Sequence, residues 1–211
     1  MKLKIKICGM SEPGNILEIA ALHPDFMGFI FYSESPRYAE KILDPEIPGR
    51  IPAGIRKTGV FVNSDYDYIS RIAAEYSLDT VQLHGNETAG LCNSLMERGI
   101  SVIKTFSITA NEDFKRCFVF TGCTDYFLFD TSASGFGGSG QKFNWKELHK
   151  YELDHPFFLS GGIGPEDYKT INEIDNPSFF GIDLNSRFEI KPGLKDRAVL
   201  EKFISDLRQN L

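Results

Sequence analysis

The sequence predicts an α/β fold, a single (β/α)8 barrel that spans residues 1–211. Two observations lead to this prediction. Short apolar runs rich in Ile, Val and Phe recur along the chain, and stretches of helical length separate most of them, which favours parallel strands joined by right-handed crossovers. Eight such units fit into 211 residues, and this favours a closed barrel over the alternative, a doubly wound sheet.

Eight apolar segments are predicted to be the strands. They are short and rich in β-branched and aromatic residues, as half-buried or fully buried strands are. The run Tyr-Phe-Leu-Phe before Asp130 is an example. In chain order, the predicted strands are residues 4–8, 26–31, 55–61, 80–83, 102–105, 126–130, 157–160 and 179–183.

Helices or helical turns are predicted between these strands. Pro13, Pro36 and Pro165 suit the first turn of a helix, where the missing N–H is harmless, and Asn144 suits an N-cap. Apolar residues at helical spacing support the segment 65–76. In chain order, the predicted helical segments are 13–22, 36–43, 65–76, 87–98, 111–117, 144–150, 165–172 and 195–211.

Composition and charge narrow the class of protein. The formal net charge of -6 argues against a general nucleic-acid or anionic-membrane surface but leaves room for a small anionic substrate. The longest apolar runs hold about half a dozen residues, far below the roughly 20 of a spanning helix. The N-terminal run reaches Gly9 too soon for a signal-peptide core. We therefore expect neither nucleic acid nor membrane as a partner.

The four cysteines are scattered, with no C-x-x-C pair and no nearby zinc-type His spacing. They are Cys8, Cys92, Cys117 and Cys123. This pattern indicates a reduced, cytoplasmic protein without a metal site.

The chain shows no sign of a second domain. No linker, charge block or repeat divides it, so we expect one domain. No long apolar edge stands out, so we expect a monomer or weak homodimer.

Reactive side chains follow the predicted strands. Because the carboxyl ends of parallel strands meet at one rim, this register brings a thiol, an imidazole, two carboxyl groups, an arginine and a glycine pair together. The candidate site residues are Cys8, Arg37, His84, Asp130, Gly161, Gly162, Asp183, Asn185 and Ser186.

Cys8 and Asp130 are the candidates for proton transfer. Gly9 allows a sharp turn after Cys8, so the thiol can face the central cavity, although a small inert core residue is the alternative. Asp130 ends a strongly apolar run, and desolvation there would raise its pKa toward that of a general acid. An N-cap or a buried salt bridge is the alternative for Asp130.

Two glycine-rich segments suggest ligand contacts. Gly161 and Gly162 open a helix after the seventh strand, and with Asn185 and Ser186 they form the loops that often bind phosphate in such barrels. Plain turn chemistry is the alternative. The glycine-rich segment 135–140 suggests a loop that orders over a ligand, but its spacing does not fit a dinucleotide fingerprint.

The remaining rim residues suit binding more than catalysis. Arg37 can hold a carboxylate with its planar fork, although a solvated Arg is the commoner case. His84 ends the fourth strand and is more often a structural group than a catalytic one. Asp183 has neighbours that favour a bracing role in its loop.

Eight short motifs follow one another along nearly the whole chain. They are 6–9 (KICG), 28–31 (GFIF) with 35–38 (SPRY), 59–63 (GVFVN), 81–85 (VQLHG), 137–140 (GGSG), 159–163 (LSGGI), 181–183 (GID) and 192–196 (PGLKD). Each motif alone is weak evidence, but their order is highly specific. In this order they resemble the phosphoribosylanthranilate isomerase family of tryptophan biosynthesis.

The resemblance implies a barrel that performs an Amadori rearrangement without metal or organic cofactor. It makes Cys8 the general base and Asp130 the general acid, acting on a small phosphosugar substrate. It also implies that Arg37 holds the anthranilate carboxylate and that the backbone near Gly162 with the Asn185–Ser186 segment holds the phosphate. A thiolate base requires surroundings that lower the pKa of Cys8.

This sequence departs from the family pattern at three positions. Arg187 stands where a glycine is usual, Ser139 where threonine is usual and Asn144 where aspartate is usual. Arg187 either adds a phosphate contact or points to solvent. Two alternatives to this reaction are a related aminoaldose isomerase, which uses two aspartates, and a barrel that only binds phosphosugars. Cys8 argues against the first, and the presence of both Cys8 and Asp130 argues against the second.

Overall fold

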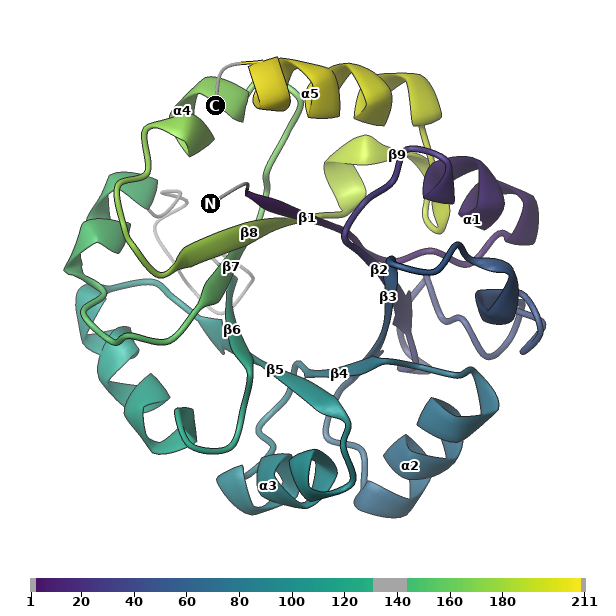
Figure 1. Cartoon of the computed structure of the whole chain (residues 1–211), viewed down its shortest axis with the longest axis horizontal. Coiled ribbons are helices and arrows are strands. Elements are labelled where there is room, and N and C mark those ends of the chain that lie inside the picture. Colours follow the sequence, from purple (N-terminus) through teal and green to yellow (C-terminus); the bar gives the residue numbers. More distant parts are fainter. Residues whose placement is uncertain (1–2, 131–143, 210–211) are drawn as a thin grey trace.

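The computed structural model describes residues 3–130 and 144–209. Eight parallel strands close into a barrel in the order β1 to β8, and the helical segments surround it (Figure 1). β1 closes the ring by pairing with β8, with Ile5 opposite Ile182. The strands are β1 (Lys4–Ile7), β2 (Phe26–Ile30), β3 (Arg56–Phe61), β4 (Thr80–Leu83), β5 (Ser101–Ser107), β6 (Tyr126–Asp130), β7 (Phe157–Ser160) and β8 (Phe179–Leu184).

The predicted eight-stranded (β/α)8 TIM barrel is therefore confirmed, and each predicted strand overlaps an observed one. Strand bounds differ by at most two residues, with the largest difference at the end of β5. The doubly wound sheet is excluded because β1 and β8 pair directly.

Helices and 3-10 segments alternate with the strands. Their starts follow local chemistry: Pro13 occupies the first turn of α1, and Asp65 caps α2 by accepting a hydrogen bond from Tyr68 N at 2.8 Å. The α-helices are α1 (Pro13–Ala20), α2 (Tyr66–Glu75), α3 (Ala89–Glu97), α4 (Tyr168–Asn172) and α5 (Arg197–Gln209). The 3-10 segments are η1 (Pro48–Arg50), η2 (Asn111–Phe120), η3 (Trp145–Lys150) and η4 (Ser186–Phe188).

Two helix predictions need correction. Residues 36–43 form turns and no helix, because Ala39 N donates to Ile30 O at 2.8 Å and draws this segment alongside the end of β2. Residues 165–167 form a turn, and α4 begins only at Tyr168, so Pro165 precedes the helix. The predicted N-cap at Asn144 is confirmed, since its side chain accepts a hydrogen bond from Lys146 N.

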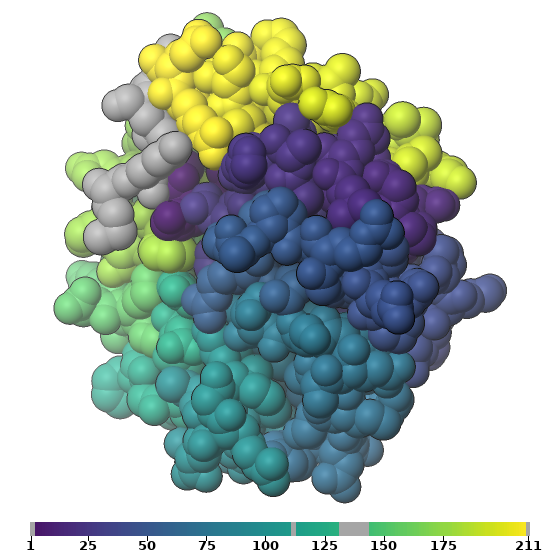
Figure 2. All heavy atoms as spheres, turned by 45° about the vertical axis from the view of Figure 1, so that its right-hand side comes forward, coloured from purple at the N-terminus to yellow at the C-terminus, as the bar shows by residue number. Residues whose placement is uncertain are grey.

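A short hairpin that the sequence did not predict follows β8. It consists of β9 (Glu189–Lys191) and β10 (Leu194–Lys195), which pair antiparallel. Asn15 of α1 anchors it, because Asn15 Oδ1 accepts from Lys195 N at 2.8 Å. The N-terminal and C-terminal parts of the chain consequently lie side by side, as the purple and yellow segments in Figure 2 show.

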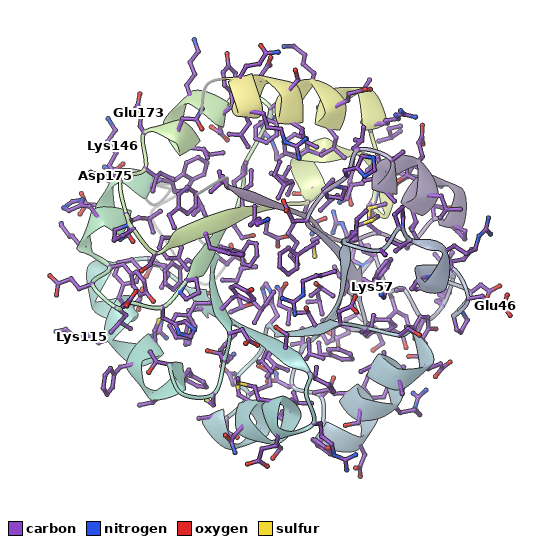
Figure 3. All side chains as sticks on the ribbon, viewed as in Figure 1. Glu46, Lys57, Lys115, Lys146, Glu173 and Asp175 are labelled. Carbon is purple, nitrogen blue, oxygen red and sulfur yellow. The ribbon has the colours of Figure 1, made fainter. Side chains whose placement is uncertain are left out.

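The apolar core has two parts. A small cluster of Phe26, Ile103, Leu128 and Phe158 fills the inside of the barrel, and a larger cluster lies between strands and helices. Figure 3 shows side chains filling the ring of strands, while charged residues such as Glu46 and Lys115 lie at the outer edge. Within the described part of the chain, every helix is too short or too polar to span a bilayer.

Candidate active site

A cavity of about 420 Å³ opens at the carboxyl ends of the strands. Its lining includes eight of the nine predicted site residues, contributed by or following β1, β4, β6, β7 and β8. This convergence follows from the parallel barrel, which directs every strand end to one rim. The eight residues are Cys8, His84, Asp130, Gly161, Gly162, Asp183, Asn185 and Ser186.

Cys8 directly follows β1 and is only 3% exposed. Its backbone N donates to Leu184 O at 2.8 Å, which fixes the residue at the β1–β8 seam. Burial raises the pKa of the Cys8 thiol, while the nearby ammonium of Lys6 opposes that increase. The free chain therefore does not meet the requirement for a lowered pKa of Cys8, because loss of hydration outweighs the nearby positive charges.

Lys6 is fully buried inside the barrel and forms an ion pair with Asp183. Its Nζ lies 2.8 Å from Asp183 Oδ1. Burial disfavours the charge on Lys6, but attraction to Asp183 and Cys8 outweighs this effect and raises the pKa of Lys6. Asp183 thus holds a charged lysine inside the barrel, close to the thiol of Cys8.

Asp130 ends β6 and faces the same cavity as Cys8. On the shorter way round the barrel, β7 and β8 separate β6 from β1, so the carboxyl and the thiol approach the cavity from different sides. Asp130 Oδ2 lies 3.7 Å from His84 Nε2. A molecule placed in this cavity can therefore meet both a carboxyl group and a thiol.

Gln82 on β4 holds His84. Its Nε2 lies 3.0 Å from His84 Nδ1 and 3.3 Å from Thr105 Oγ1. Among the described residues, the buried Gln82 Oε1 finds no hydrogen-bond partner. Since Gln82 lines the cavity, this oxygen can accept a hydrogen bond from a substrate hydroxyl.

The loops after β7 and β8, where the sequence predicts an anion site, both contribute to the cavity lining. Gly161 and Gly162 adopt positive φ values of 99° and 70°, which glycine accommodates without strain. Ser186 begins η4 beside them on the cavity wall. Arg187 pairs with Glu166 at 3.0 Å and is about half exposed, so it bridges the two loops at the surface.

Arg37 is the predicted site residue that does not line the cavity. Its Nε and Nη2 donate to the Glu189 carboxylate at 2.8 and 2.6 Å. The hydrogen bonds to Glu189 raise the pKa of Arg37, and the guanidinium is mostly buried. Arg37 therefore has a protein partner on the hairpin rather than the solvated position that is commoner for arginine.

Four residues near the site were missed at the sequence level: Lys6, Gln82, Glu189 and Lys195. Lys6, Gln82 and Lys195 lie in segments that resemble the family. Lys6 and Gln82 alternate with apolar residues, and Lys195 stands next to Asp196, so none of the three gives a sign of facing the site. Glu189 and Lys195 come together only through the unpredicted hairpin, where Lys195 Nζ lies 2.8 Å from Glu189 Oε1.

The described residues contain no cluster of three or more His, Cys, Asp or Glu side chains that would hold a metal ion. The predicted glycine-rich loop, residues 135–140, lies outside the described residues. What the described site offers is a thiol, a carboxyl group, a glycine pair and the buried ammonium of Lys6, which pairs with Asp183.

Comparisons with known proteins agree with this geometry. The family model described as N-(5'phosphoribosyl)anthranilate (PRA) isomerase matches residues 5–206. An N-(5'-phosphoribosyl)anthranilate isomerase of Parabacteroides distasonis is 47% identical over 204 residues, which covers 96% of this chain and 92% of that protein.

Solved structures are similar over the whole barrel. The phosphoribosyl anthranilate isomerase of Thermotoga maritima has a TM-score of 0.85 at 32% identity, covering 99% of this chain and 100% of that one. A second isomerase structure, in complex with reduced 1-(o-carboxyphenylamino)-1-deoxyribulose 5-phosphate, has a TM-score of 0.80 at 29% identity, with the same coverage of both chains. With fold, site and sequence in agreement, the chain belongs to the N-(5'-phosphoribosyl)anthranilate isomerase family.

Proposed function

We propose that Cys8 is the general base and Asp130 the general acid in the isomerisation of N-(5'-phosphoribosyl)anthranilate, the family's reaction in tryptophan biosynthesis. The observation that supports these roles best is the shared cavity, which a thiol and a carboxyl group enter from different strands. The product is 1-(2-carboxyphenylamino)-1-deoxyribulose 5-phosphate, so the reaction is an aldose–ketose rearrangement.

The chemistry explains the two residue types. Asp130 protonates the furanose ring oxygen, and the ring opens to a cationic Schiff base. That positive charge makes the C2′ proton acidic, and Cys8 as thiolate removes it to give an enolamine, which tautomerises to the ketone. Because the pKa of free Cys8 is raised, Lys6 and the substrate cation help to stabilise the thiolate.

The phosphate is proposed to bind at the loops after β7 and β8. Gly161 and Gly162 allow backbone N–H groups to approach an anion closely, and Asn185 and Ser186 lie on the same wall. His84 lies next to Asp130 and is held by Gln82, so both side chains can contact the sugar from the cavity wall. Both ends of the substrate are then held while the reacting carbon lies between acid and base.

Arg37 is proposed to bind the anthranilate carboxylate while Glu189 holds its guanidinium in place. Replacing Arg37 with alanine is expected to raise KM by about 10–100-fold with a smaller change in kcat, the equivalent of losing charge-assisted hydrogen bonds of about 1.5–3 kcal/mol. Steady-state kinetics measures both constants. Arg71→Ala, an exposed arginine on α2, is the matched control, and an unchanged KM in Arg37→Ala would refute the role.

Gly28 on β2 gives the thiol its space. A Cβ at this position would lie 2.7 Å from Cys8 Sγ and 3.2 Å from Lys6 Nζ. Gly28→Ala is therefore expected to displace the thiol and to lower kcat by about 100-fold. The control is Gly14→Ala in α1, where a Cβ meets nothing within 4 Å. Comparable kcat values for the two variants would show that Cys8 needs no exact placement.

The remaining inferences concern assembly and location. We infer that the chain acts as a monomer or weak homodimer in the cytoplasm, on a small phosphosugar. Large exposed apolar side chains in the described residues are few, and only Phe118 and Val119 are neighbours. Two adjacent exposed side chains make an apolar patch that is small for a stable protein interface.

A further inference from the structure

The segment 192–196 (PGLKD) has no role in the chemistry described so far. It closes the hairpin of β9 and β10 and carries Lys195, whose side chain is fully buried. Lys195 Nζ donates to Glu189 Oε1 and to Asn185 Oδ1, both at 2.8 Å. A buried ammonium therefore lies directly behind an asparagine of the cavity wall.

Gly9 brings this ammonium close to the proposed base. Gly9 follows Cys8 with a φ of 76°, and a Cβ on it would lie 2.7 Å from Asn185 Oδ1 and 2.6 Å from Arg37 Cδ. The missing side chain thus lets Asn185 and Arg37 pack against the backbone next to Cys8.

The charges around Cys8 do not cancel. Lys6, Arg37 and Lys195 are cations, whereas Asp183 and Glu189 are the carboxylates that pair with them. Three positive charges against two negative ones leave this group with one positive charge in excess. Burial lowers the pKa of Lys195, and the negative charges of Glu189 and of a Cys8 thiolate oppose that decrease. A Cys8 thiolate also favours the charged forms of Lys6 and Arg37. A Cys8 thiolate would restore neutrality.

Lys195 is held so that its charge cannot move to water. Its backbone N donates to Asn15 Oδ1 at 2.8 Å, and its carbonyl accepts from Asn15 Nδ2 at 3.0 Å. Ser11 N donates to Gly193 O at 3.3 Å, which ties the hairpin to the loop after β1. A charge fixed in a water-poor site stabilises a developing anion more strongly than an exposed one.

We propose that Lys195 is a positioning residue that stabilises the Cys8 thiolate from behind Asn185, with Glu189 and Arg37 keeping its ammonium in place. This role rests on the proposed function of Cys8 as the base. It gives the hairpin of β9 and β10 a function: the hairpin places the Lys195 ammonium near Cys8, where burial disfavours the thiolate.

The test measures the thiol directly. The rate of Cys8 alkylation by iodoacetamide is recorded as a function of pH, with the Cys8 peptide quantified by mass spectrometry, because only the thiolate reacts. Lys195→Met and Lys195→Gln remove the charge, and the glutamine retains a hydrogen-bond donor. Lys195→Arg retains the charge. Lys191→Met, an exposed lysine on the same hairpin, is the matched control.

Both neutral variants are expected to shift the alkylation midpoint upward by about one pH unit, a tenfold slower reaction at a fixed pH below the midpoint. Lys195→Arg and Lys191→Met should keep the wild-type midpoint. An unchanged midpoint in either folded neutral variant, or a shifted one in Lys195→Arg, would overturn the proposal. Where the neutral variants do not fold, a shifted midpoint in Lys195→Arg by itself overturns the proposal.

Alkylation needs no substrate, so this result is independent of turnover. If Cys8→Ser retains full activity, the proposed function fails whatever the alkylation shows. If Cys8→Ser is inactive while the midpoint ignores the charge at position 195, only the role of Lys195 fails.

Discussion

Asp130→Asn is expected to lower kcat by about 10²–10⁴-fold while the barrel stays folded, because the amide keeps the shape of the carboxyl group but has no acidic proton. The loss should appear in kcat more than in KM, since protonation of the ring oxygen occurs on the way to the transition state. The loss of substrate fluorescence over time measures turnover, and circular dichroism verifies the fold.

The matched control is Asp125→Asn, just before the start of β6. Asp125 accepts hydrogen bonds from Ser101 Oγ and Val102 N at 2.8 Å, away from the cavity lining. This variant should lose stability but retain kcat. Turnover close to the wild-type rate in Asp130→Asn would remove Asp130 as the acid and would turn attention to His84, 3.7 Å away.

Cys8→Ser is expected to lower kcat by about 10²–10⁴-fold, because a serine hydroxyl is a far poorer base precursor than a thiol at any accessible pH. The substitution removes little volume, and the backbone hydrogen bond from residue 8 to Leu184 O is unaffected. Binding should therefore survive, and KM should change less than kcat.

Cys123→Ser is the control for Cys8→Ser, since Cys123 is also buried but lies outside the cavity lining. Its activity should equal that of the wild type. If Cys8→Ser and Cys123→Ser turn over substrate at the same rate, the thiol has no part in proton transfer, and the base must be another group on the rim.

The barrel was predictable because its signals are local. Each strand is a compact apolar run, such as the residues before Asp130, and in a parallel sheet with both faces covered such runs need no alternation. Once the strands are placed, the geometry of a parallel barrel brings their carboxyl ends together. For this reason eight of the nine predicted site residues line one cavity.

The sequence predictions fail where tertiary contacts determine the local structure or the burial of a side chain. Residues 36–43 have a helix-like start at Pro36, but a hydrogen bond from Ala39 to the end of β2 holds them in turns. In the sequence, Lys195 and Glu189 resemble ordinary surface charges, and only the packing of the hairpin on α1 buries them. The pKa of Cys8 depends on the balance between burial and Lys6, which no local pattern reveals.

The measurement that decides most directly is the fluorescence time course of freshly generated N-(5'-phosphoribosyl)anthranilate mixed with the purified wild-type chain. We expect anthranilate-type fluorescence to fall at a rate proportional to the concentration of the chain, with 1-(2-carboxyphenylamino)-1-deoxyribulose 5-phosphate as the product. A folded wild-type chain that leaves the fluorescence decaying no faster than in buffer alone would contradict the assignment of this cavity as the isomerase site.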